Sequence, residues 1–201
     1  MLKFSKIVIS ILCLLTIWGC PSSIGKLYQY ELVEEIEATC IVVVLESHAE
    51  EIALFEKYNK DKKAHRLSKR DSLKHAYIQA AFQEHYRYSP YYFTTNYSYC
   101  WEEVNLLDKN LEPIEIDLDT REIFVCEFEK DVSFTTQGDN DREQDIVRMR
   151  IRKIGESSDS YKTALAVEQE GVPNKWTYNQ LVKKMNLRLY KLRGKGKQAK
   201  S

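Results

Sequence analysis

The sequence predicts an α/β protein: a small mixed sheet with one right-handed β-α-β crossover, further antiparallel strands and a C-terminal helix. Residues 38–45 form a continuous, largely β-branched apolar run, which is typical of a strand covered on both faces. No glycine or proline occurs between Lys26 and Ser89, so this stretch is expected to be regular and mostly helical. Residues 177–192 carry apolar side chains at helical spacing.

Two capping boxes divide the expected helical region. Ser47 and Glu50 form the first box, because each side chain can bond the backbone N–H of the other. Three apolar residues then share one helical face: Ile52, Phe55 and Tyr58. A second, weaker box covers residues 68–71. The charged stretch 60–66 is expected to join two helices, although one long helix also fits the sequence.

Strands are expected after Pro90, which ends the helical region. Residues 91–99 follow as a strand, and a strand–helix–strand unit is nearly always a right-handed crossover between parallel strands. Three further segments are predicted to be antiparallel strands: 111–118, 122–129 and 145–153. Residues 119–121 fit a hairpin turn between the first two, and residues 137–143 read as a polar loop.

The first nineteen residues are predicted to be a secretory signal peptide. Lys3 and Lys6 precede an apolar run over residues 7–18, and Gly19 and Cys20 close that run. The run is too short for a typical bilayer span, which needs about 20 apolar residues. The chain is therefore expected to be exported.

The segment Ile17-Trp18-Gly19-Cys20 resembles the signal of bacterial lipoproteins, in which a cysteine follows an aliphatic and a small residue. The resemblance implies a diacylglycerol on the Cys20 thiol and an acyl chain such as palmitate on the new amino terminus. Trp18 departs from the pattern, where a smaller residue is usual. The alternative is an ordinary secretory signal cut near Gly19.

The mature chain is predicted to hold one domain. Residues 20–37 fit either a tether or a first helix, residues 38–193 form the single α/β domain, and residues 194–201 a flexible basic tail after Gly194. Loss of residues 1–19 lowers the Lys and Arg count from 30 to 28, against 30 Asp and Glu. This balance gives no reason to expect nucleic acid as a partner.

Common catalytic and metal-binding signatures are missing from the sequence. The chain has no nucleophile elbow, phosphate-binding glycine loop or Cys-x-x-Cys pair, and its four histidines lack metal-ligand spacing. We therefore predict no enzymatic activity, no metal and no cofactor. Cys100 and Cys126 flank or occupy expected strands and could form a disulfide in an oxidising compartment.

One candidate ligand face lies in an aromatic segment. Its members are Tyr91, Phe93, Tyr97, Tyr99 and Trp101. Such rings can stack on a glycan or peptide, but strands also favour aromatic residues for packing in the core. The packing interpretation is preferred.

A second candidate is an anion clamp formed by Arg148, Arg150 and Arg152, which project from one face of a strand. An acidic row alternates in the same way: Glu115, Asp117 and Asp119. Cross-strand pairing of the two rows would explain both without a ligand, and this interpretation is preferred.

The C-terminal region is basic, with nine Lys or Arg and no acidic residue after Glu170. A basic amphipathic helix can lie on anionic lipid. The preferred interpretation is that the helix docks on the sheet through its apolar stripe, which includes Leu181, Met185, Leu189 and Leu192.

Together these features predict an exported lipoprotein of the bacterial cell envelope, anchored in a membrane by its N-terminal lipid and periplasmic or surface-facing. Its domain would bind or scaffold an envelope protein or glycan without catalysis. The first alternative is a soluble periplasmic or secreted protein that binds a glycan or peptide. The second is a hydrolase whose site the sequence does not reveal.

Overall fold

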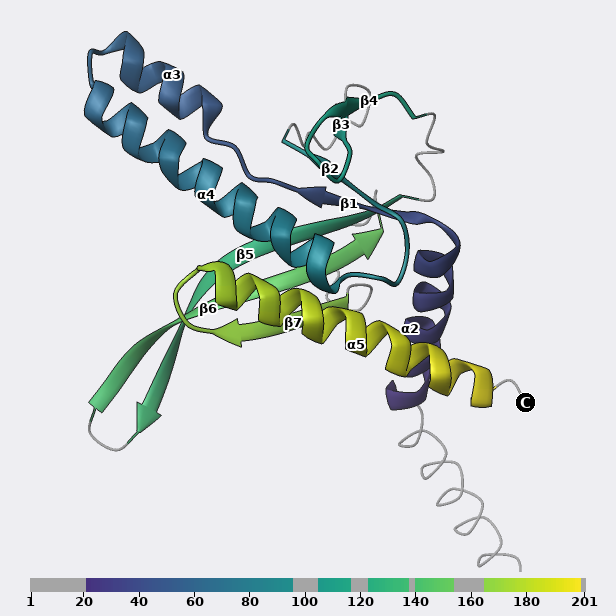
Figure 1. Cartoon of the computed structure of the whole chain (residues 1–201). Coiled ribbons are helices and arrows are strands. Elements are labelled where there is room, and N and C mark those ends of the chain that lie inside the picture. Colours follow the sequence, from purple (N-terminus) through teal and green to yellow (C-terminus); the bar gives the residue numbers. More distant parts are fainter. Residues whose placement is uncertain (1–20, 96–104, 117–122, 138–139, 154–164, 200–201) are drawn as a thin grey trace, which may run out of the picture.

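The computed structural model describes residues 21–95, 105–116, 123–137, 140–153 and 165–199. It confirms the α/β class, with a seven-stranded mixed sheet in the order β4-β3-β2-β1-β5-β6-β7. Helices α4 (Asp61–His85) and α5 (Lys175–Ala199) lie side by side across one face of the sheet (Figure 1). The main core lies between that face and these helices.

Strand β1 (Cys40–Val44) lies in the middle of the sheet. It pairs in parallel with β2 (Tyr91–Thr94) on one side and with β5 (Ile123–Gln137) on the other. Ile41 and Val43 face the main core, whereas Val42 belongs to a smaller apolar cluster. The strand is therefore apolar throughout because both of its faces are covered, as the sequence predicts.

The parallel pairing of β1 with β2 confirms the expected crossover, which runs through helices α3 (Ala49–Lys57) and α4. The chain breaks between these helices at Asn59, whose φ is 54°. Asparagine adopts this left-handed conformation more readily than most residues. The expected linker 60–66 is wrong, because α4 begins at Asp61 and includes nearly all of it.

The capping box at Ser47 is also wrong. His48 occupies the N-cap position of α3 and makes no side-chain capping bond there. The carboxylate of Asp71 instead accepts a hydrogen bond from the backbone N–H of His48, with N and Oδ2 2.9 Å apart. The second box, 68–71, lies inside α4 and starts no helix.

Helix α3 does not contribute to the core, and none of its residues is buried. The apolar face expected there is therefore only partly covered, with Ile52 and Phe55 half-buried. Tyr58, the last member of that face, is 61 % exposed. Helices α3 and α4 pair with each other and project from the end of the sheet (Figure 1).

The expected hairpin between residues 111–118 and 122–129 is wrong. Strand β4 (Pro113–Ile114) lies at one edge of the sheet and pairs with β3 (Leu106–Leu107). Strand β5 lies on the other side of β1, where its apolar beginning is covered on both faces. The expected turn, 119–121, lies outside the described residues.

Strands β5 and β6 (Asn140–Lys153) form one long hairpin in which Gln137 pairs with Asn140. Most of the polar loop expected over residues 137–143 is therefore part of the two strands. The outer half of the hairpin extends beyond the sheet (Figure 1). Strand β7 (Leu165–Glu170), which the sequence analysis missed, pairs with β6 and forms the other sheet edge.

Helix α5 docks on the sheet, as predicted. Its buried stripe consists of Tyr178, Leu181, Val182, Met185 and Leu189. Gly194 does not end the helix, so the flexible tail expected over residues 194–201 is wrong up to Ala199. The helix continues because it packs on α2 (Pro21–Ala38): a Cβ at Gly196 would lie 3.3 Å from Cβ of Tyr30. The sequence left open whether residues 20–37 form a tether or a first helix, and residues 21–38 form helix α2.

Candidate functional site

The aromatic candidates that the structure describes belong mainly to the core. Phe93 is fully buried, and Tyr91 is half-buried with its ring centroid 5.3 Å from that of Phe82. Burial also raises the pKa of the Tyr91 hydroxyl. The other three candidates, Tyr97, Tyr99 and Trp101, lie outside the described residues. The two described rings therefore support packing rather than a ligand face.

The arginine row forms a charge ladder, as preferred, but with different partners. Arg152 makes two hydrogen bonds of 3.0 Å to Glu127, and Arg150 pairs with Glu129 at 3.1 Å. Arg148 pairs with Glu168 at 2.7 Å. These acids lie on β5 and β7, which flank β6. The predicted partner row is wrong because Glu115 directly follows β4, across the sheet, whereas Asp117 and Asp119 lie outside the described residues.

Cys40 and Cys126 are buried free thiols in the structure. Burial raises the pKa of both, most strongly that of Cys126. A thiol held protonated in an apolar environment is a poor nucleophile. Cys20 and Cys100 lie outside the described residues, so the Cys100–Cys126 bridge stays a prediction.

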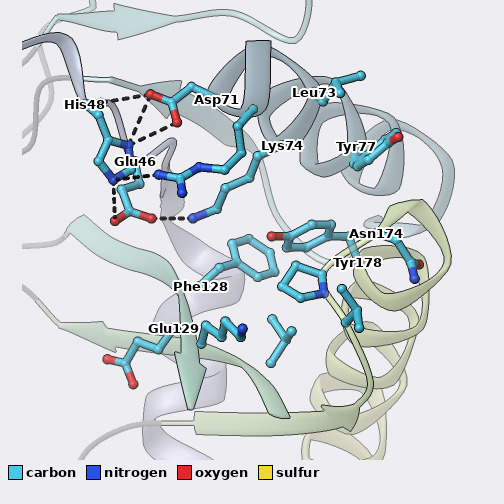
Figure 2. Close-up of a pocket in the computed structure, with 15 residues that line it drawn as sticks. Glu46, His48, Asp71, Leu73, Lys74, Tyr77, Phe128, Glu129, Asn174 and Tyr178 are labelled. Atoms are coloured by element: carbon cyan, nitrogen blue, oxygen red, sulfur yellow. Dashed lines mark hydrogen bonds and ion pairs between the residues drawn. The ribbon is translucent and has the colours of Figure 1, made fainter. Parts of the chain in front are cut away.

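A pocket of about 590 Å³ lies between α4, the start of α5 and the inner part of the β5–β6 hairpin (Figure 2). Its volume is in the range of small-molecule sites in proteins. It opens beside Glu46, just beyond the carboxyl end of β1. A second hollow continues from it along Val44 and Glu127.

The position of the pocket follows from the sheet topology. From β1 the chain crosses over to β2 on one side, whereas β5 lies on the other side of β1. The chain thus leaves β1 toward one side of the sheet, while the later strand β5 pairs on its other side, which makes β1 a topological switch point. At such a point α/β proteins bind ligands in a crevice outside the carboxyl ends of the strands. Here β5 continues past the end of β1 and supplies Phe128 as a wall.

One side of the pocket is apolar. It is lined by Leu73, Tyr77, Phe128, Val147, Val172, Pro173 and Tyr178. The rings of Phe128 and Tyr178 meet edge to face, with centroids 5.3 Å apart at 82°. Burial raises the pKa of Tyr178 to about 12, so its hydroxyl stays protonated. These rings offer a flat apolar surface of the kind that holds a ligand's hydrocarbon or aromatic part.

Beside these residues lies a charged wall built from the loop after β1 and from α4, and Glu129 and Lys130 of β5 also line the pocket. Nδ1 of His48 lies 3.0 Å from Oδ1 of Asp71, whose residue is only 6 % exposed (Figure 2). Because a carboxylate only accepts hydrogen bonds, Nδ1 carries the proton in this contact. Asp71 thus fixes both the backbone and the ring of His48 against α4.

The second ring nitrogen of His48 faces both a donor and an acceptor. Nε2 lies 3.4 Å from a guanidinium nitrogen of Arg70 and 3.6 Å from Oε1 of Glu46. Glu46 also pairs with Lys74. Burial alone would raise the pKa of Glu46, but the hydrogen bond and charge of Lys74, with His48, outweigh it and lower that pKa.

Arg70 is the cation of this wall that is least engaged by the protein. Among the described residues, it contacts no carboxylate within ion-pair distance, and its single hydrogen-bond contact is the long one to His48. Lys74 and Lys130 in contrast pair with Glu46 and Asp145. Most N–H donors of Arg70 therefore remain available to an anionic group in the pocket.

Among the described residues that line the pocket there is no serine, threonine or cysteine, so the pair of His48 and Asp71 has no such side chain beside it to activate. Among the described residues, no group of three or more His, Cys, Asp or Glu could hold a metal ion.

The sequence analysis did not find this site. His48, Arg70 and Asp71 fall within the two expected capping boxes, and the separation of 23 positions between His48 and Asp71 gives no spacing signal. One signal was available: polar residues directly after a strand that changes the strand order mark a binding crevice. Applied to the strand predicted at 38–45, this rule would have pointed to Glu46 and His48.

Comparisons of the chain with protein-family models, with curated proteins and with solved structures found no match. No helix in the described part of the chain is both long enough and apolar enough to cross a bilayer. The described part of the chain is an α/β domain with a partly apolar, partly charged pocket at the carboxyl end of its central strand.

Proposed function

We propose that this protein is a lipid-anchored binding protein of the bacterial cell envelope, without catalytic activity. Its ligand would be a small amphipathic molecule, or a peptide end, with an apolar group and a carboxylate. The observation that carries the proposal is the pocket, whose apolar side faces a charged wall that includes the available guanidinium of Arg70.

The two halves of the pocket define the ligand class. Phe128, Tyr77 and Tyr178 fit an aliphatic or aromatic group, which is stabilised by its removal from water. Arg70 suits a carboxylate, because a guanidinium can donate two parallel hydrogen bonds to it. An apolar ligand without an anion would leave this cation unused. A small polar anion would leave the rings uncovered.

The pocket is tested with 8-anilinonaphthalene-1-sulfonate, a fluorescent probe that joins aromatic rings to an anion. We expect native protein to bind it saturably, and Arg70→Gln to weaken binding by roughly ten- to a hundredfold, the usual worth of a hydrogen bond to a charged group. Arg66→Gln, an exposed arginine on the same helix outside the pocket, is the matched control. Equal affinity in both variants would exclude the proposed anion contact.

The anchor is supported by the signal-like segment that ends at Cys20. We expect mass spectrometry of the mature protein to find Cys20 as the first residue, carrying diacylglycerol and an acyl chain. Globomycin, which blocks the lipoprotein signal peptidase, should leave the precursor uncleaved. A mature amino terminus with an unmodified Cys20 thiol would refute the anchor and favour the soluble binding protein.

A further inference from the structure

The last turns of α5 lie beside α2, the helix that begins directly after Cys20 (Figure 1). Arg193 pairs with Glu37 at 2.5 Å, and Gly196 lies against Tyr30. Residues nearer the end of α5 therefore contact residues nearer the beginning of α2. The end of α5 and the beginning of α2 thus lie at the same end of the molecule (Figure 1).

This end of the molecule carries positive charge. Some basic side chains of α5 are engaged by the protein: Lys184 by the carbonyl of Glu168, Arg188 by that of Ala166, and Arg193 by Glu37. Lys191 and Lys195, near the end of the helix, are exposed and make no ion pair within the described residues. Lys197 and Lys200 follow in the sequence.

Acidic residues do not cancel this charge at the start of α2. The acidic residues of α2 lie only in its second half, from Glu31 onward. Two of them are already paired, Glu35 with Lys153 at 2.8 Å and Glu37 with Arg193. The sequence from Pro21 to Tyr30 contains Lys26 and no acidic residue.

We propose that the basic end of α5, centred on Lys191 and Lys195, is a docking surface for anionic phospholipid headgroups. This proposal rests on the proposed anchor, which would hold that surface within reach of the membrane. Lysines near an anionic bilayer are attracted to its phosphates over about a Debye length, which is about 8 Å at physiological salt. A tethered surface needs only weak attraction of this kind, because the tether keeps its effective concentration high.

Docking by this end would orient the pocket away from the membrane. Tyr178 lines the pocket near the beginning of α5, whereas Lys195 lies near the end of this 25-residue helix. At 1.5 Å per residue, the helix separates these two positions by about 25 Å. Contact through Lys191 and Lys195 would thus leave the ligand pocket, near the other end of α5, outside the lipid contact.

The test measures lysine acetylation by mass spectrometry on vesicles. The mature chain, with a hexahistidine tag in place of Cys20, is bound to nickel-chelating lipid in phosphatidylcholine, with or without phosphatidylglycerol. We expect Lys191 and Lys195 to react roughly threefold or more slowly on the anionic vesicles. Lys60 and Lys62 are the internal control, because both are exposed at the start of α4, and the turn between α3 and α4 lies far from the end of α5 (Figure 1).

Salt provides the second arm of the test. In 1 M NaCl the Debye length is about 3 Å, so the protection of Lys191 and Lys195 should disappear while the tag still holds the protein. Equal reaction rates on both kinds of vesicle, or equal slowing at Lys60 and Lys62, would overturn the proposal. Because the tag replaces the lipid, this result does not depend on whether Cys20 is lipidated in the cell. Mass spectrometry of the mature protein tests lipidation of Cys20 separately.

Discussion

Leu189→Ala is expected to lower the free energy of unfolding by about 2–5 kcal/mol, the usual cost of deleting a buried leucine side chain. Leu189 is fully buried in the main core, within the stripe through which α5 packs on the sheet. Its loss removes apolar area from the core and leaves a cavity. Chemical denaturation of the mature domain, followed by circular dichroism, measures the effect.

Leu187→Ala is the matched control, because it changes the same residue type in the same helix at a position that is 60 % exposed. Its effect should stay within about 0.5 kcal/mol. If the two variants lose similar stability, α5 does not dock through the face that contains Leu189. A neutral Leu189→Ala that loses binding to anionic vesicles would instead favour a helix that lies on lipid.

The parts of the fold that the sequence predicts are those with strong local patterns. Strand β1 is a continuous β-branched run, and α5 shows its apolar stripe directly in the spacing from Tyr178 to Leu189. The parallel pairing of β1 and β2 follows from chain topology, because a crossover helix must connect them. In each case the sequence pattern and the tertiary packing agree.

The errors arise where distant contacts decide the structure. The predicted hairpin before β5 relied on closeness in sequence, but the apolar residues from Ile123 to Cys126 are better covered beside β1 than at an edge. Gly194 is a helix terminator in isolation, yet α2 packs on the following turn at Gly196 and the helix continues. Neither contact leaves a local signal in the sequence.

The candidate site illustrates the same limit. Its pocket is lined by residues from the loop after β1, from α4, from the β5–β6 hairpin and from the start of α5 and the turn before it. Asp71 looked like part of a capping box because its main partner, His48, lies 23 residues earlier. The sequence alone does not distinguish a carboxylate that accepts a hydrogen bond at the start of another helix from one that caps its own helix.

Glu127→Ala is expected to lower the free energy of unfolding by about 3–5 kcal/mol, the cost of removing one partner from a buried ion pair. Glu127 accepts two hydrogen bonds of 3.0 Å from Arg152, whose side chain is only 4 % exposed. The substitution removes a carboxylate that makes two hydrogen bonds to this guanidinium and compensates it for its loss of water. Urea denaturation measures the change.

Glu168→Ala is the control from the same ladder, because the side chain of Glu168 is half exposed and its partner Arg148 also lies within 4.0 Å of Glu129 and Asp131. Surface pairs contribute only about 0–1 kcal/mol, so this variant should be nearly neutral. The double variant Glu127→Leu/Arg152→Met removes both charges of the pair and should recover most of the stability lost in Glu127→Ala. If it does not, the contribution of Glu127 lies outside its pairing with Arg152. Recovery would show that the ion pair adds little net stability compared with apolar side chains at the same two positions.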